Sequence, residues 1–91
     1  MPPTEPAPVE PVVAALVVDA SGRYCPGPVI DAKNAVSQIA VGEVFELITT
    51  DPGSLSDIPV WCTNTGNVLL ASERGPGGDD GPHRFFIRRG R

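Results

Sequence analysis

Several residue types are scarce in this chain, and each scarcity argues against a class of protein. Only two cysteines, Cys25 and Cys62, occur among 91 residues, too few for a small domain held together by disulfide bonds. They fall in different predicted elements and form no C-x-x-C pair. With His83 as the single histidine, the usual four nitrogen and sulfur ligands of a structural zinc site are missing. We therefore expect neither a disulfide framework nor a metal site.

Long apolar runs and excess positive charge are also lacking. No segment is long and apolar enough to span a membrane, and the N-terminal segment has neither the basic start nor the apolar stretch of a secretory signal. The formal net charge of −4 argues against general nucleic-acid binding, because a phosphate backbone is held by basic surfaces. We expect a soluble, cytoplasmic protein with no membrane or general nucleic-acid partner.

Length and composition predict one small domain that follows a tail. Residues 1–11, MPPTEPAPVEP, hold five prolines and show no apolar periodicity. We therefore predict a disordered Pro-rich tail there and a folded domain over 12–91. Aromatic residues make up 5% of the chain and hydrophobic residues 41%, which predicts a core mainly of Val, Ile, Leu and Ala.

The apolar pattern predicts the element order βαβαββ. Short runs rich in β-branched and aromatic residues predict strands at about 15–19, 43–50, 67–73 and 83–89. A strand, a helix and a strand in succession form a right-handed parallel unit. Two helices cannot cover both sheet faces in so short a chain. The predicted fold class is α+β: a two-layer α/β sandwich with a four-stranded mixed sheet and two helices on one face.

Two segments show the apolar spacing of helices. The first extends from Pro28, in a favourable first-turn position, to about Ala40, and Gly42 is expected to end it. The second covers 54–66, where an internal Pro59 requires either a regular start near Ser56 or a bend.

Cys25 stands just before the first predicted helix, in the stretch SGRYCPGPVIDAKNAV at 21–36. Free N–H groups and the helix dipole at such a place favour the reactive thiolate. Pro26 and Pro28 carry no N–H, which leaves Gly27 and Val29 as the nearest donors and predicts moderate activation. Because each proline fixes its own φ, we expect the loop to hold the sulfur outward. The alternative is a small hydrophobic side chain that fills a strand–helix corner.

Other polar and sulfur-bearing residues have simpler interpretations. Cys62 follows Trp61 on the apolar side of the second predicted helix, so we interpret both as packing residues, with Trp61 buried against the sheet. Asp51 and Asp57 are interpreted as turn and cap residues rather than as a general acid/base pair.

A longer pattern surrounds the cysteine. Cys25-Pro26-x-Pro28 after a strand, Lys33 in a helix, DP at 51–52, DIPVW at 57–61, TGN before a strand and FFIRR near the end together resemble the TusA-like family, also called SirA-like. The resemblance covers about residues 15–90. It implies a βαβαββ sandwich with Cys25 as the catalytic, sulfur-carrying residue and Pro26, Gly27 and Pro28 as motif support. The chain departs from the best-known members at 22–24, Gly-Arg-Tyr in place of Gly-Leu-Arg.

The hypothesis that follows is a sulfur-relay protein of the sulfurtransferase type. Cys25 would accept sulfane sulfur as a persulfide and pass it on, without a cofactor. The expected partners are a persulfide donor, such as a cysteine desulfurase or a rhodanese, and an acceptor protein with a reactive cysteine. The resemblance leaves tRNA thiolation, molybdenum-cofactor sulfuration and sulfur oxidation open as pathways.

Two other functions also stay open. One is a regulatory or structural binding module with an incidental thiol, which would dock through its Arg-rich last strand or its Pro-rich tail. The other is a redox sensor in which Cys25 and Cys62 form a switchable disulfide.

Overall fold

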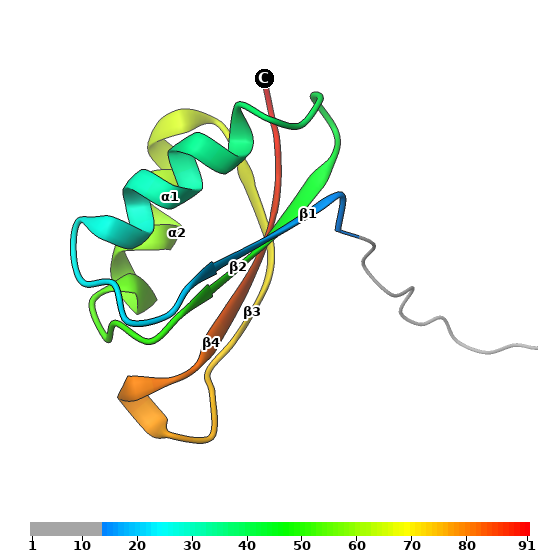
Figure 1. The fold of residues 1–91 in the computed structure, drawn as a ribbon. Helices are drawn as coiled ribbons and strands as arrows, with labels where there is room; N and C mark the ends of the chain where they lie inside the picture. Colours follow the sequence, from blue (N-terminus) through cyan, green and yellow to red (C-terminus); the bar gives the residue numbers. More distant parts are fainter. Residues whose placement is uncertain (1–13) are drawn as a thin grey trace, which may run out of the picture.

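The computed structural model describes residues 14–91 (Figure 1). The predicted tail at 1–11 and the predicted domain start at 12 lie outside the described residues. The elements are β1 (Leu16–Ala20), α1 (Gly27–Val36), β2 (Val44–Thr49), α2 (Ser54–Thr65), β3 (Val68–Glu73), the short 3-10 helix η1 (Gly78–Asp80) and β4 (His83–Arg88). The predicted order βαβαββ is confirmed, with η1 added in the last connection.

The strands form a single mixed sheet in the order β1-β2-β4-β3. β1 and β2 pair in parallel, as expected for strands joined by a crossover helix. β4 lies between β2 and β3 and is antiparallel to both. Both helices cover the same side of the sheet (Figure 1), so the predicted two-layer α+β sandwich is confirmed.

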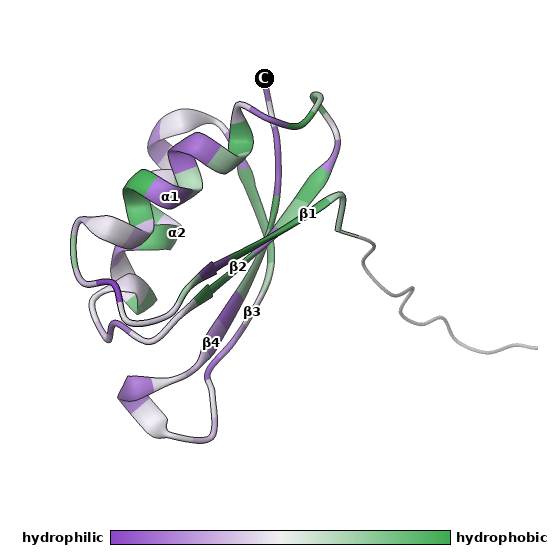
Figure 2. Cartoon of the chain, viewed as in Figure 1, coloured by the Kyte–Doolittle hydropathy of each residue, from purple (hydrophilic) through white to green (hydrophobic). Residues whose placement is uncertain are grey.

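The core lies between the sheet and the two helices. Alternate residues of β2 and β4 point into it, and the most buried of them are Phe45, Leu47, Phe85 and Ile87. They pack with Ile58 of α2 and with the small side chains of α1. In Figure 2 hydrophobic stretches of the strands alternate with hydrophilic ones, whereas the β3–β4 connection is hydrophilic or neutral throughout. The predicted composition is wrong in one respect: two phenylalanines, and no valine, belong to the fully buried set of the described residues.

α1 differs from its predicted bounds at both ends. It begins at Gly27, one residue before Pro28, and it ends at Val36 rather than near Ala40. The early end has a local cause, because the side chains of Ser37 and Gln38 both donate hydrogen bonds to the Asn34 carbonyl.

Gly42 was expected to end this helix, but it does not cap it. It lies in the turn that leads into β2, with a φ of +92°, a conformation that favours glycine.

α2 begins at Ser54, two residues before the predicted start near Ser56, and continues through Pro59. Its N-cap residue is Gly53, and no side chain caps it. In helix geometry the proline removes the N–H that would bind the Leu55 carbonyl. Both Leu55 and Pro59 are half-buried, so water can reach this part of the helix.

Candidate functional site

Cys25 lies in the β1–α1 loop, next to the loop that joins β2 to α2. Because β1 and β2 are parallel neighbours, their carboxyl ends meet at one edge of the sheet. There the Gly22 N–H donates to Thr50 Oγ1 at 2.8 Å, and the Cys25 N–H donates to Asp51 Oδ2 at 3.1 Å. The thiol is therefore placed where the N-terminal ends of α1 and α2 come together (Figure 1).

Asp51 is the residue that joins these two loops. It is only 7% exposed, and its second carboxylate oxygen accepts a hydrogen bond from the Gly53 N–H at 3.2 Å. The interpretation of Asp51 as a turn residue is confirmed by this local bond. The contact with Cys25 was not predicted, although a "DP" directly after the parallel partner of β1 could have indicated it.

The three motif residues that follow the cysteine differ in solvent exposure. Cys25 and Pro26 are exposed, whereas Gly27 and Pro28 are buried. The Gly27 N–H donates to the Tyr24 carbonyl at 2.6 Å, so the prediction that this amide is free for the sulfur is wrong.

A charged pair adds a further link between this loop and α1. The Arg23 guanidinium lies 2.9 Å from the Asp31 carboxylate. Together with the backbone contact to Asp51, this pair connects the Cys25 loop to α1 and to the β2–α2 loop.

The electrostatics of Cys25 also differ from the prediction. Partial desolvation raises the pKa of the Cys25 thiol, and a hydrogen bond with Asp57 together with the negative charges of Asp57 and Asp51 raises it further. Desolvation, followed by the two carboxylates, thus distinguishes this thiol from one free in water. The expected shift toward thiolate is therefore wrong: at neutral pH the side chain is a protonated thiol.

Cys62 has the opposite surroundings. It is 2% exposed on the inner face of α2, and burial raises the pKa of its thiol to about 11. The prediction that it is a packing residue is confirmed. Its burial disfavours the redox-sensor interpretation, because a switch cysteine has to be reached by an oxidant and by its partner.

A hollow of about 400 Å³ opens beside the Cys25 loop, lined by Gly22, Arg23, Tyr24, Pro26, Gly27 and Ile30. Two large apolar side chains on its margin face water, since Tyr24 is 70% exposed and Ile30 is 46% exposed. Apolar surface beside an exposed thiol is suited to contact with another protein.

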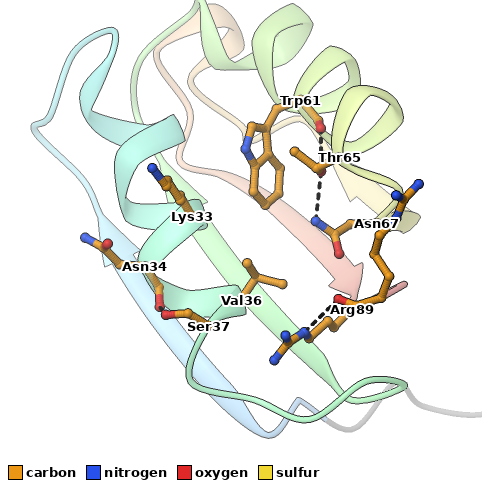
Figure 3. A pocket seen from close by; sticks show the side chains of 9 residues that line it. Lys33, Asn34, Val36, Ser37, Trp61, Thr65, Asn67 and Arg89 are labelled. Atoms are coloured by element: carbon orange, nitrogen blue, oxygen red, sulfur yellow. Dashed lines mark hydrogen bonds between the residues drawn. The ribbon is translucent and has the colours of Figure 1, made fainter.

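A second hollow, of about 380 Å³, lies between the later turns of the two helices, away from Cys25 (Figure 3). Trp61 forms part of its wall beside Lys33 and Arg89. Trp61 is half-buried and packs against the core, which agrees with the prediction of substantial burial, although part of the residue lines this hollow. The Arg89 guanidinium donates a hydrogen bond to the Ile39 carbonyl at 2.6 Å. This bond links the residue after β4 to the α1–β2 connection.

Within residues 14–91, no three side chains of the His, Cys, Asp and Glu types come together as a group that could hold a metal ion. In the same part of the chain, no helix has the length and apolar character needed to cross a membrane.

Residues 16–89 match the family described as Sulfurtransferase TusA. The chain belongs to this family. It is 36% identical over 72 residues to the sulfur carrier protein TusA of Allochromatium vinosum, an alignment that covers 79% of this chain and 90% of that protein. A relative from Halobacterium salinarum, whose name also designates a sulfur carrier protein, is 38% identical over 79% of this chain and 85% of its own. A relative from Archaeoglobus fulgidus is 44% identical over 55 residues, an alignment that covers 60% of this chain and 75% of that protein.

The family match starts at the first residue of β1 and ends one residue after β4. All four strands and both helices therefore belong to the TusA domain, and the resemblance inferred from the sequence is confirmed.

Proposed function

We propose that this protein is a sulfur-relay protein that accepts sulfane sulfur as a persulfide on Cys25 and passes it to an acceptor protein. One observation carries the proposal: the sulfur-bearing side chain is exposed, while its backbone is held by a long-range hydrogen bond to the buried Asp51. The site thus combines access for a partner with a fixed position, which a group-transfer residue requires.

Sulfur transfer through Cys25 is balanced without an external oxidant or reductant. In loading, the Cys25 thiolate attacks the outer sulfur of a donor persulfide, a new S–S bond forms, and the S–S bond of the donor breaks. The donor thiolate leaves and takes up a proton. In discharge an acceptor thiolate attacks the outer sulfur on Cys25, a new S–S bond forms on the acceptor, and the S–S bond at Cys25 breaks. The Cys25 sulfur leaves as a thiolate and is then protonated. No cofactor takes part in either step.

The motif residues support this chemistry by fixing the loop. Pro28 is fully buried and anchors the first turn of α1, while Gly27 is buried beneath Arg23. Pro26 lies exposed next to the thiol and has no N–H to offer the sulfur. We assign these three residues to the presentation of Cys25 rather than to its ionisation.

The partners follow from the same chemistry. The donor would be a persulfide-bearing protein such as a cysteine desulfurase or a rhodanese, and the acceptor a protein with a reactive cysteine, both acting in the cytoplasm. The hollow beside Tyr24 and Ile30 is the surface on which we expect them to dock. Cys62, because it is buried, does not compete for the sulfur.

The test compares Cys25→Ser with Cys62→Ala. Each variant is incubated with a cysteine desulfurase and sulfur-labelled cysteine, and the protein-bound label that a reductant releases is counted. We expect no label on Cys25→Ser, with an unchanged melting temperature, and full labelling of Cys62→Ala. Labelling of Cys25→Ser to the level of the unaltered protein would show that the thiol is incidental and would favour the binding-module alternative.

A further inference from the structure

The hollow between the later turns of α1 and α2 shares no lining residue with the hollow beside the Cys25 loop. Its volume of about 380 Å³ falls within the range of roughly 300–1,000 Å³ that small-molecule sites occupy. Figure 3 shows the Trp61 indole extending from α2 into the space between the helices. The hollow thus offers an aromatic wall to a ligand, at a place that the proposed sulfur relay does not use.

Every charged side chain that lines this hollow, among the described residues, is basic. Lys33, Arg89 and Arg91 contribute to its wall, and no aspartate or glutamate does. Within residues 14–91 none of the three belongs to an ion pair, although the chain carries a formal net charge of −4. Basic side chains gathered around one hollow without an acidic partner attract an anion.

The backbone carbonyls near the ends of the two helices have partners of their own. Ser37 and Gln38 donate to the Asn34 carbonyl of α1. Thr65 donates to the Trp61 carbonyl of α2 at 2.7 Å. Unpaired carbonyls and the negative end of the helix dipole are common reasons for basic side chains to gather at a helix C-terminus. Here these carbonyls are already bonded, so they do not account for three basic residues.

The three basic residues differ in what they already contact. The Arg91 side chain lies against Gly66, the C-cap residue of α2, where it balances the negative end of the helix dipole. The Arg89 guanidinium donates to the carbonyls of Ile39 at 2.6 Å and Arg91 at 3.0 Å. Both acceptors are uncharged, so they fix the guanidinium and leave its charge unneutralised. Lys33 of α1 is exposed. Lys33 and Arg89 are therefore available to bind an anion.

We propose that this hollow binds a free mononucleotide, with its base against the Trp61 indole and its phosphate facing Lys33 and Arg89. A phosphate monoester carries close to two negative charges and three acceptor oxygens at neutral pH, which matches two cations better than a single carboxylate does. Nucleobases of every kind stack on aromatic side chains. A polynucleotide is a poorer match, because a chain with a net charge of −4 has little basic surface along which to bind a phosphate backbone.

The experiment uses the fluorescence of Trp61, the single tryptophan of the chain, excited where nucleotides do not absorb. The full chain is titrated with AMP at low ionic strength, and we expect saturable quenching together with a higher melting temperature. Adenosine lacks the phosphate and inorganic phosphate lacks the ring, so each should bind about ten-fold more weakly than AMP or less tightly still.

Lys33→Gln removes one of the two cations from an exposed position and should weaken AMP binding several-fold. Arg88→Gln is the matched control, because Arg88 precedes Arg89 in the chain, is exposed on β4 and does not line the hollow. It loses the same charge and should bind AMP as the unaltered protein does. The melting temperature without ligand reports the fold of each variant.

Three results would overturn the proposal. The first is the absence of saturable quenching by AMP, and the second is adenosine binding as tight as that of AMP. The third is equal weakening by Lys33→Gln and Arg88→Gln, which would mean that net charge, rather than this hollow, attracts the nucleotide. A short single-stranded RNA that binds more tightly than AMP would likewise replace the free mononucleotide with RNA as the ligand.

Discussion

Cys25 and Cys62 carry the same functional group in two different parts of one small sandwich. Burial in the core raises the pKa of Cys62 to about 11, while loop desolvation and the carboxylates of Asp57 and Asp51 raise that of the exposed Cys25. Both are therefore thiols at neutral pH. The difference teaches that access, rather than the thiolate fraction of the resting protein, separates the cysteine that we propose to carry sulfur from the packing cysteine.

The two regions are also stabilised in different ways. Around Cys62 the contacts are apolar, between the inner face of α2 and the sheet. Around Cys25 they are hydrogen bonds between loops that are distant in sequence, from Gly22 to Thr50 and from Cys25 to Asp51. A change to the core should therefore affect stability most, and a change to the loop should affect reactivity most.

The largest expected effect is on alkylation of the native protein. Iodoacetamide should modify Cys25 and spare Cys62, which reacts only when the protein opens, slower by a factor on the order of 10³ or more. Peptide mass spectrometry after a short reaction measures both sites, and the same reaction in denaturant should modify both. Equal modification of the two cysteines in the folded protein would remove the basis of the comparison.

A pair of isoleucines tests the difference in stability. Ile58 of α2 is fully buried, so Ile58→Ala should lower the free energy of unfolding by about 2–5 kcal/mol through lost contacts and a cavity. Ile30 of α1 is exposed beside the Cys25 loop, and Ile30→Ala should change the free energy of unfolding by about 0.5 kcal/mol or less. Denaturant unfolding measures both values; similar losses would mean that the loop region is part of the stabilising core.

The smallest expected effect is on stability at alkaline pH. The folded protein favours the Cys62 thiol, because burial raises its pKa from 9.0 to about 11. Unfolding thus releases a proton in this window, and the free energy of unfolding should fall as pH rises from 9.0 to about 11.

Denaturant unfolding of Cys62→Ala should show a shallower fall over the same window. Cys25→Ala measures how much the exposed thiol contributes to this fall in the free energy of unfolding. The contribution has the same sign as that of Cys62, because the pKa of Cys25 is also raised. Identical slopes for Cys62→Ala and the unaltered protein would contradict the account of Cys62.

Most of the fold could be predicted from the sequence, because strand and helix periodicity is a local signal. The ends of α1 could not: Ser37 and Gln38 compete for the Asn34 carbonyl, which the apolar spacing of the helix does not reveal. Pro59 likewise suggested a later or bent helix, yet α2 continues through it.

The site was only partly predictable. The exposed position of Cys25 and the burial of Cys62 follow from a loop and an apolar helix face, which a sequence displays. The direction of the Cys25 pKa does not, because it depends on desolvation in the folded loop and on carboxylates that come from the second loop and the second helix. The start of α1 taken alone suggests a lowered pKa, yet its nearest amide, that of Gly27, already donates to the Tyr24 carbonyl.

The central claim is that Cys25 takes up a single sulfur atom and gives it away. The most direct measurement is peptide-resolved mass spectrometry of the unaltered protein after incubation with a cysteine desulfurase and cysteine, before and after a thiol acceptor is added. We predict that the peptide containing Cys25 gains the mass of one sulfur atom and loses it to the acceptor, while the Cys62 peptide stays unchanged. Added mass on Cys62 alone, or on neither cysteine with desulfurase and rhodanese donors, would contradict the account.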